Sequence, residues 1–134
     1  MAGPIQTRSL DYSDLDLDFI AHPVTGDVVK KTGPDAVGRA IRNLVLTNFY
    51  DRPFRSYIGS SAQKILFDNI SQMTAKNLEN AIKEVIVNFE PRASVIGVKV
   101  TASPDQNGYN AKIVFNVINR PEPYQTTIFL ERVR

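Results

Sequence analysis

The chain has 134 residues, of which 43% are hydrophobic and 22% are charged, and its formal net charge is +2. These values predict one globular domain that can bury a core without a metal or a disulfide. The absence of cysteine excludes disulfides, thiolate catalysis and cysteine-ligated zinc. Because the positive charges are scattered along the chain, we expect no nucleic-acid partner. No apolar run approaches the roughly 20 residues of a membrane span, so we expect no membrane partner either.

The N-terminal part of the sequence predicts an arm followed by a β-hairpin. Residues 1–13 are polar and irregular, which is typical of a mobile arm, and residues 14–134 are expected to form the single domain. Strict alternation over 14–21 predicts a half-buried strand, and 27–30 a second, short strand. The first strand would turn Leu15, Leu17, Phe19 and Ala21 toward the core, and Asp14, Asp16 and Asp18 toward solvent.

Three helices are predicted in the middle of the chain. The sequence Thr32-Gly33-Pro34-Asp35 has the residues of a helix start, and apolar residues at helical spacing extend this helix over 34–48. A shorter helix, which carries Ile65, Leu66 and Ile70, follows a cap at Ser60 or Ser61. The third helix begins after Thr74, and it must end by Pro91 because the residue before a proline is disfavoured in a helix.

The C-terminal part predicts three strands. Apolar residues occupy every second position in three segments, Ile96–Val100, Tyr109–Val117 and Tyr124–Leu130, which are separated by turn residues. Strands grouped at the two ends and helices grouped in the middle predict an α+β fold. Its parts would be an N-terminal β-hairpin, three central helices on one face, and a C-terminal three-stranded antiparallel meander.

The sequence offers little for catalysis. His22 is the single histidine and precedes a proline in a predicted turn, and no glycine-rich phosphate loop occurs. The Asp14, Asp16 and Asp18 series lacks the glycine and closing glutamate of an EF-hand. We therefore expect no catalytic residue, no metal, no cofactor and no small-molecule substrate, so the protein is not expected to be an enzyme.

A glycosidase is the main enzymatic alternative. Such enzymes need two carboxyl groups about 5 to 9.5 Å apart. Glu79 and Glu90 lie near one face of the third helix, but eleven residues separate them by roughly 16 Å along the axis. The sequence does not decide whether Glu90 could form such an acid pair with Asp68 or with Glu122. A nucleic-acid-binding module is a further alternative.

Several motifs carry a family resemblance over residues 15–132. They are Ala40-Ile41-Arg42-Asn43-Leu44, Arg52-Pro53-Phe54 with Gly59, Ile65-Leu66-Phe67-Asp68-Asn69-Ile70, and Asn88-Phe89-Glu90-Pro91-Arg92 before the strand Val95–Val100. Together they resemble the small baseplate wedge proteins of contractile phage tails, a family that includes the corresponding baseplate component of type VI secretion systems. Tyr50-Asp51 and Ile58 depart from the family's usual residues around the central loop.

The resemblance implies a structural role. Members of this family join the helical core bundle of the baseplate wedge and provide the platform for the first ring of the tail sheath. Their fold is similar to the interlocking domain of the sheath subunit. The resemblance thus implies a virion tail baseplate protein, assembled in the cytoplasm of the host bacterium, whose partners are other wedge proteins and the sheath protein. The family has also carried a lysozyme label. In phage lysozymes an aspartate follows the catalytic glutamate nine residues later, and none of Glu79, Glu84, Glu90 and Glu122 has an aspartate at that position.

The segment Glu90-Pro91-Arg92 is the first candidate for partner binding. A glutamate in the last turn faces the negative end of the helix dipole, which costs about 0.3–1 kcal/mol. We infer that Glu90 has a cationic partner, which is either Arg92 or a donor on another subunit. The alternative is a purely structural role, in which Pro91 ends the helix and Arg92 bonds to the free carbonyls of its last turn.

Two further surfaces are candidates for partner binding. The last predicted strand leaves an edge to which another chain could add a strand, unless the N-terminal strand covers it. Phe129 and Val133, on the face opposite Ile128, would then meet a neighbour. In the central loop, Arg52, Pro53 and Phe54 have a composition suited to interfaces. The alternative is that Phe54 anchors the loop in the core.

Overall fold

The computed structural model describes residues 12–132, so most of the arm predicted for 1–13 lies outside the described residues. The chain forms two compact units, residues 1–36 and 37–134. The division falls inside the first helix, α1 (Gly33–Leu46), rather than in a linker. A single domain over 14–134 stays a prediction.

The first unit contains a small hairpin. Its strands, β1 (Ser13–Leu15) and β2 (Lys30–Thr32), pair antiparallel, with Ser13 opposite Thr32. An isolated bridge between Ala21 and Val28 holds the outer part of the hairpin. The predicted hairpin therefore exists, but its strands are much shorter than the predicted 14–21, and the second begins at Lys30.

The predicted faces of the first strand are wrong. Asp16 is only 2% exposed, whereas Leu15, Leu17 and Phe19 are all exposed. The strand stops at Leu15, and the chain turns at Asp16, whose carbonyl accepts from the amide of Phe19 at 3.1 Å. The Asp16 carboxylate also accepts from the amide of Asp18 and lies 3.7 Å from the Lys31 ammonium. A local turn built on a short polar side chain has thus replaced the extended strand.

The three predicted helices are present. They are α1, α2 (Ala62–Ile65) and α3 (Gln72–Phe89). α2 is shorter than predicted, because it ends at Ile65 and Ile70 lies outside it. α3 ends before Pro91 as predicted, but its N-cap is Ser71 rather than Thr74, because the Ser71 hydroxyl accepts from the Thr74 amide at 3.1 Å. Thr74 instead donates its hydroxyl to the carbonyl of Asn69.

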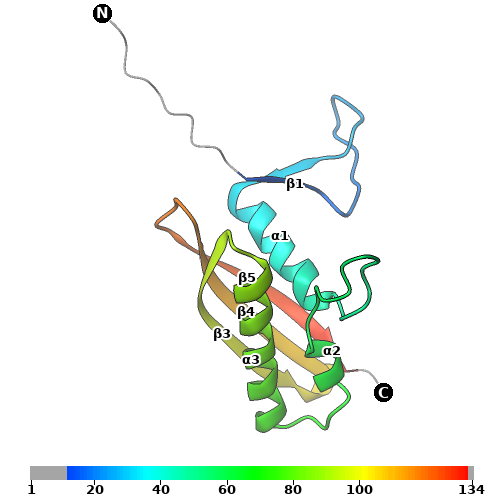
Figure 1. Ribbon diagram of the computed structural model, residues 1–134, viewed down its shortest axis with the longest axis vertical. Coiled ribbons are helices and arrows are strands. Elements are labelled where there is room, and N and C mark those ends of the chain that lie inside the picture. Colours follow the sequence, from blue (N-terminus) through cyan, green and yellow to red (C-terminus); the bar gives the residue numbers. More distant parts are fainter. Residues whose placement is uncertain (1–11, 133–134) are drawn as a thin grey trace, which may run out of the picture. The chain divides into compact units, whose positions relative to one another are not determined.

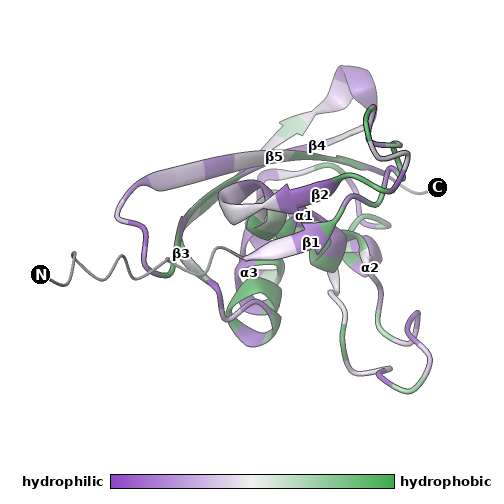
Figure 2. Cartoon of the chain, turned by 90° about the horizontal axis from the view of Figure 1, so that it is seen from above, coloured by the Kyte–Doolittle hydropathy of each residue, from purple (hydrophilic) through white to green (hydrophobic). Residues whose placement is uncertain are grey.

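The second unit carries a three-stranded antiparallel sheet in the order β3-β4-β5. The strands are β3 (Ala93–Ser103), β4 (Gly108–Val117) and β5 (Pro123–Glu131), and a short 3₁₀ turn, η1 (Pro104–Gln106), joins the first two. Figures 1 and 2 show the helices of this unit on one face of the sheet. The predicted α+β fold class is confirmed.

The core of the second unit lies between that face and the helices. Alternate residues of β4 and β5 are buried as predicted, among them Tyr109, Phe115 and Ile128. One predicted core residue of β3 is wrong: Ile96 is exposed. A bulge between Val95 and Gly97 inserts an unpaired residue, which shifts the alternation by one position.

Candidate interaction surfaces

The end of α3 contains a short, buried ion pair. The Glu90 carboxylate accepts from Nε of Arg92 at 2.7 Å and from Nη2 at 2.9 Å, a two-point contact. The side chains are 5% and 23% exposed. Of the two partners that the sequence left open for Glu90, this chain uses its own Arg92.

The ion pair stabilises the turn between helix and sheet. The Glu90 amide donates to the carbonyl of Ile86, which caps α3, and the Arg92 carbonyl accepts from Ile118 at 3.0 Å. Pro91, between them, is exposed. Partner binding by this segment stays a prediction, and a partner would meet Pro91 and the outer side of Arg92, because the Glu90 carboxylate is buried.

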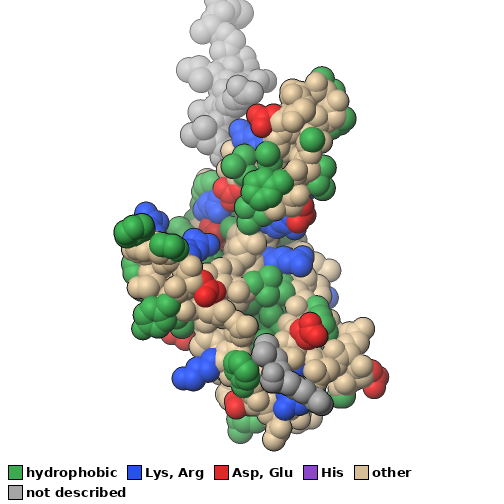
Figure 3. Space-filling view, turned by 90° about the vertical axis from the view of Figure 1, so that its right-hand side faces the viewer, with side chains coloured by type: hydrophobic (Ala, Val, Ile, Leu, Met, Phe, Trp, Pro, Cys, Tyr) green, Lys and Arg blue, Asp and Glu red, His purple; other side chains and the backbone are tan. Residues whose placement is uncertain are grey.

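Residues 50–58 form an exposed loop, here called the aromatic loop. Phe54 is fully exposed, and so is most of the surface of Tyr50 and Tyr57. The alternative in which Phe54 anchors the loop in the core is therefore wrong. Arg52 and Pro53 are exposed as well, and hydrophobic and basic side chains gather on this protrusion in Figure 3.

The base of the aromatic loop is tightly closed. The Ser60 amide donates to Thr47 at 2.9 Å, and its hydroxyl donates to Val45 at 2.7 Å. A Cβ at Gly59 would lie 2.5 Å from the carbonyl carbon of Asn48, so only glycine allows the two backbone segments to approach this closely. The loop thus holds its exposed aromatic residues on a fixed base.

The outer edge of β5 is open in the described part of the chain. Within the second unit β5 pairs with β4 alone, and the alternative in which the N-terminal strand covers this edge stays a prediction. In an antiparallel ladder, the backbone groups of successive residues point to opposite sides. Because the Arg132 amide bonds to Asn107 on the β4 side, the groups that point outward are those of Gln125, Thr127, Phe129 and Glu131. Pro123, which lacks an N–H, has its nitrogen on this same side.

The opposite edge of the sheet is partly closed. The Val100 amide of β3 donates to the carboxylate of Glu79 on α3 at 3.1 Å, and Lys76 bonds to the same carboxylate at 2.8 Å. The hydrogen bond from Lys76 and then that from Val100 lower the pKa of Glu79. A carboxylate over a strand edge blocks pairing with another chain. The sequence reasoning treated Glu79 only as a candidate acid, and its spacing of three from Lys76 was the available signal.

Phe129 lies on the face predicted for it. It is 42% exposed and is on the opposite face of β5 from Ile128. Its ring covers Gly108, where a Cβ would be 2.6 Å from a ring carbon. Val133, the second residue predicted on this surface, lies outside the described residues.

The hairpin of the first unit exposes apolar residues, and three of them, Leu15, Leu17 and Phe19, were predicted to face the core. The others are Ile20 and Val24. Exposed apolar groups that gather in one place are typical of protein contact sites. The alternation of apolar and acidic residues over 14–21 was visible in the sequence, but its apolar side was predicted to face the core.

Three hollows of the second unit lack the pair of acids that a glycosidase needs. Their volumes are about 260, 340 and 520 Å³, and none is lined by two acidic residues. Glu90, Asp68 and Glu122, the acids left open by the sequence, line none of the three. Among residues 12–132 no cluster of three metal-ligating side chains occurs. In the same range, no helix combines the length and apolar character needed to cross a membrane.

Comparisons with known proteins give the family of this chain. The profile of the family described as "Baseplate wedge protein gp25" matches residues 31–122, more than half of the chain. The chain belongs to the gp25 baseplate wedge family. It is 28% identical over 111 residues to baseplate wedge protein gp25 of Enterobacteria phage T4, and the match covers 83% of each chain. It is thus a structural component of the baseplate of a phage or phage-like contractile tail.

Solved structures share the gp25-family fold. A Geobacter sulfurreducens protein whose assignment as a tail lysozyme is provisional superposes with a TM-score of 0.68 at 19% identity, covering 73% of this chain and 89% of that one. A chain of the anti-feeding prophage baseplate gives 0.62 at 21%, covering 92% and 88%. A chain of the post-contraction pyocin R2 baseplate gives 0.53 at 15%, covering 88% and 98%.

Proposed function

We propose that this wedge protein acts by shape, without catalysis, as a connector between the baseplate wedge and the tail sheath. Its helical side docks to other wedge proteins of the core bundle. Its β5 edge accepts a strand of the sheath protein and so provides the platform for the first sheath ring. Assembly takes place in the cytoplasm of the host bacterium.

The observation that carries the proposal is the difference between the two sheet edges. At β3, the outward amide of Val100 already donates to the carboxylate of Glu79. At β5, the outward groups of residues 125–131 have no strand partner in the described chain. Main-chain hydrogen bonds from an added strand would satisfy these groups and would give affinity. Because Glu79 obstructs the β3 edge at Val100, a strand is expected to add at the β5 edge.

Two exposed surfaces of the second unit, the aromatic loop and the turn Glu90-Pro91-Arg92, are proposed to dock wedge partners. The aromatic loop offers Phe54 between two arginines on a fixed base, the composition of an interface anchor. The turn Glu90-Pro91-Arg92 offers an exposed proline beside a guanidinium that its own carboxylate holds in place. Both surfaces lie at rigid points of the backbone, so binding would require little ordering of side chains.

Replacement of Thr127 by proline tests the strand addition. The Thr127 amide points outward, so Thr127→Pro removes a donor from the open edge without removing a bond to β4. We expect the variant to fold with little loss of stability and to lose most of its binding to assembled tails or to purified sheath protein. Cosedimentation measures the binding, and denaturant unfolding measures the stability.

Two control variants accompany this test. Thr127→Val keeps the backbone amide and should bind like the parent protein. Thr126→Pro removes an amide that faces Ile113 of β4, and we expect it to destabilise the fold by about 1–3 kcal/mol. Full sheath binding by a folded Thr127→Pro protein would contradict the proposed role of the β5 edge.

A further inference from the structure

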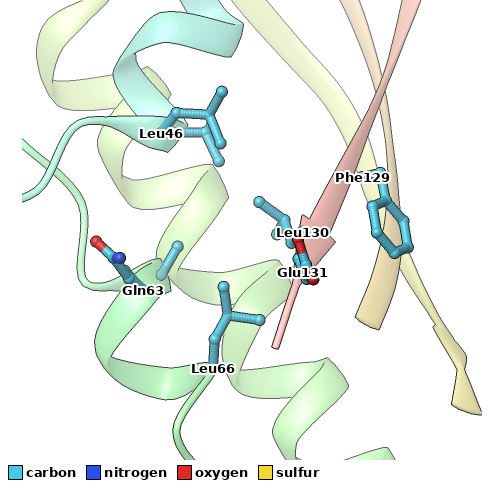
Figure 4. Close-up of a pocket in the computed structure, with 8 residues that line it drawn as sticks. Leu46, Gln63, Leu66, Phe129, Leu130 and Glu131 are labelled. Carbon is cyan, nitrogen blue, oxygen red and sulfur yellow. The ribbon is translucent and has the colours of Figure 1, made fainter. Parts of the chain in front are cut away.

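A pocket lies directly beside the open edge of β5. Its lining comes from the end of α1, from α2 with the residue that follows it, and from β5, and includes Leu46, Gln63, Leu66, Phe129, Leu130 and Glu131. In Figure 4, Leu130 points toward Leu46 and Leu66, whereas the ring of Phe129 lies on the other side of the strand. The pocket is therefore on the inner, helix-covered face of the sheet.

The size and lining of this pocket suit a side chain better than a small molecule. Its volume is about 260 Å³, below the roughly 300–1,000 Å³ of typical ligand sites. Leu46, Leu66 and Leu130 make its walls apolar. Gln63 and Glu131 are the polar residues among the lining.

The position of the pocket matches the geometry of strand addition. In a sheet, residues directly opposite each other on neighbouring strands point to the same face. A residue placed opposite Leu130 by a strand added to β5 would point to the inner face, where the pocket opens. Leu46 is 49% exposed at its wall, so an apolar group there would remove further apolar surface from water.

We propose that the strand bound by β5 carries one large apolar residue, such as leucine, isoleucine or phenylalanine, whose side chain fills this pocket. The inference rests on the proposed strand addition at β5 and adds the feature that sets its register. Backbone bonds alone repeat along an edge and define register poorly, because a shift of two residues restores the same pattern. Because this pocket lies beside Leu130, the apolar residue that fills it would have to lie opposite Leu130, and this fixes the register.

Synthetic peptides test this inference on the intact protein. The probes are end-blocked nine-residue peptides with lysine at outward positions and threonine at inward positions. One central inward position is alanine, leucine or aspartate. We expect the leucine peptide to bind about tenfold to fiftyfold more tightly than the alanine peptide, depending on how fully its three extra carbons are buried, and the aspartate peptide to bind least. Titrations followed by NMR chemical shifts measure the dissociation constants and locate the peptide.

A pair of matched variants assigns the preference to the pocket. Leu46→Lys should reduce the ratio of leucine to alanine affinity to about one, and Val87→Lys, at an exposed apolar position on α3, should leave it unchanged. Equal binding of the leucine and alanine peptides by the parent protein would overturn the anchor pocket but leave strand addition standing. No binding by any peptide, or binding that Thr127→Pro does not weaken, would overturn strand addition and the pocket with it.

Discussion

At the scale of single residues, the contact between Glu90 and Arg92 has the clearest consequence. A carboxylate with 5% exposure depends on its partner, because an unpaired charge at such a site is poorly solvated. The pair also crosses the turn that connects α3 to β3. Its first role in this chain is therefore structural, and any contact with another subunit uses a guanidinium that is already oriented.

Replacement of Arg92 should be strongly destabilising. We expect Arg92→Ala to lower the free energy of unfolding by about 3–5 kcal/mol, since it leaves the Glu90 carboxylate buried without its ion pair. Arg92→Lys keeps the charge but loses the two-point geometry, so its loss should be smaller. Denaturant unfolding measures both variants.

This prediction also limits how partner binding by Arg92 can be measured. A charge reversal at either residue would weaken assembly through lost stability as well as through any lost contact. Assembly assays should therefore use Arg92→Lys at temperatures where it is folded. A stability change below about 1 kcal/mol for Arg92→Ala would show that the carboxylate does not depend on this arginine.

Glu79 should make the stability depend on pH. Its pKa is lowered in the folded protein by Lys76 and by the Val100 amide, from an ordinary value of 4.5. The stabilisation is fully present above that ordinary value and is lost as the pH falls through the lower, folded pKa. In Glu79→Gln, the fall in stability on acidification below about pH 4.5 should be shallower than in the parent protein. Identical pH profiles in thermal unfolding would contradict this assignment.

At the scale of elements, the aromatic loop depends on how closely its two ends approach each other. Its base joins Asn48 to Ser60 in a parallel bridge, and Gly59 lies against the Asn48 backbone. The loop can be rigid although most of its side chains face solvent, because backbone hydrogen bonds rather than packing close it. Exposed residues on a rigid base are well suited to recognition.

Replacement of Gly59 should open this base. We expect Gly59→Ala to cost about 1–3 kcal/mol, because the new methyl group would clash with backbone that cannot move aside cheaply. Gly97→Ala is the matched control, since a Cβ there meets nothing within 4 Å, and it should be nearly neutral. Unfolding measurements give the difference, and equal stability of the two variants would show that the loop base adapts.

Other elements differ in how well the sequence predicted them. α3 and β4 were predicted closely, because each has a long, regular apolar pattern and a definite stop. β1 was predicted with the wrong face, because three residues of strand are too few for alternation to fix a side, and the turn at Asp16 depends on Lys31, fifteen residues away. The bulge at Ile96 was also missed, since it depends on pairing with β4.

At the scale of the whole molecule, the proposed role as a connector predicts an absence of turnover. The purified protein should release no more fragments from labelled peptidoglycan than buffer does, and Glu90→Gln should change nothing in this assay. The reason is that the Glu90 carboxylate is engaged by Arg92 and lines none of the three hollows described above. Release above the background that Glu90→Gln abolishes in a folded protein would favour a glycosidase instead.

The sequence by itself determined the fold class, the central helices, the strands of the meander and the resemblance to a wedge family, because local periodicity and short motifs carry this information. Only the tertiary structure decided which partner Glu90 takes, that Phe54 is exposed, that Glu79 partly closes one sheet edge and that a pocket lies beside the other. The physical reason is distance along the chain. Glu79 meets Val100 across 21 residues, and the pocket joins α1 to β5 across more than 80, whereas a sequence pattern describes neighbours within one element.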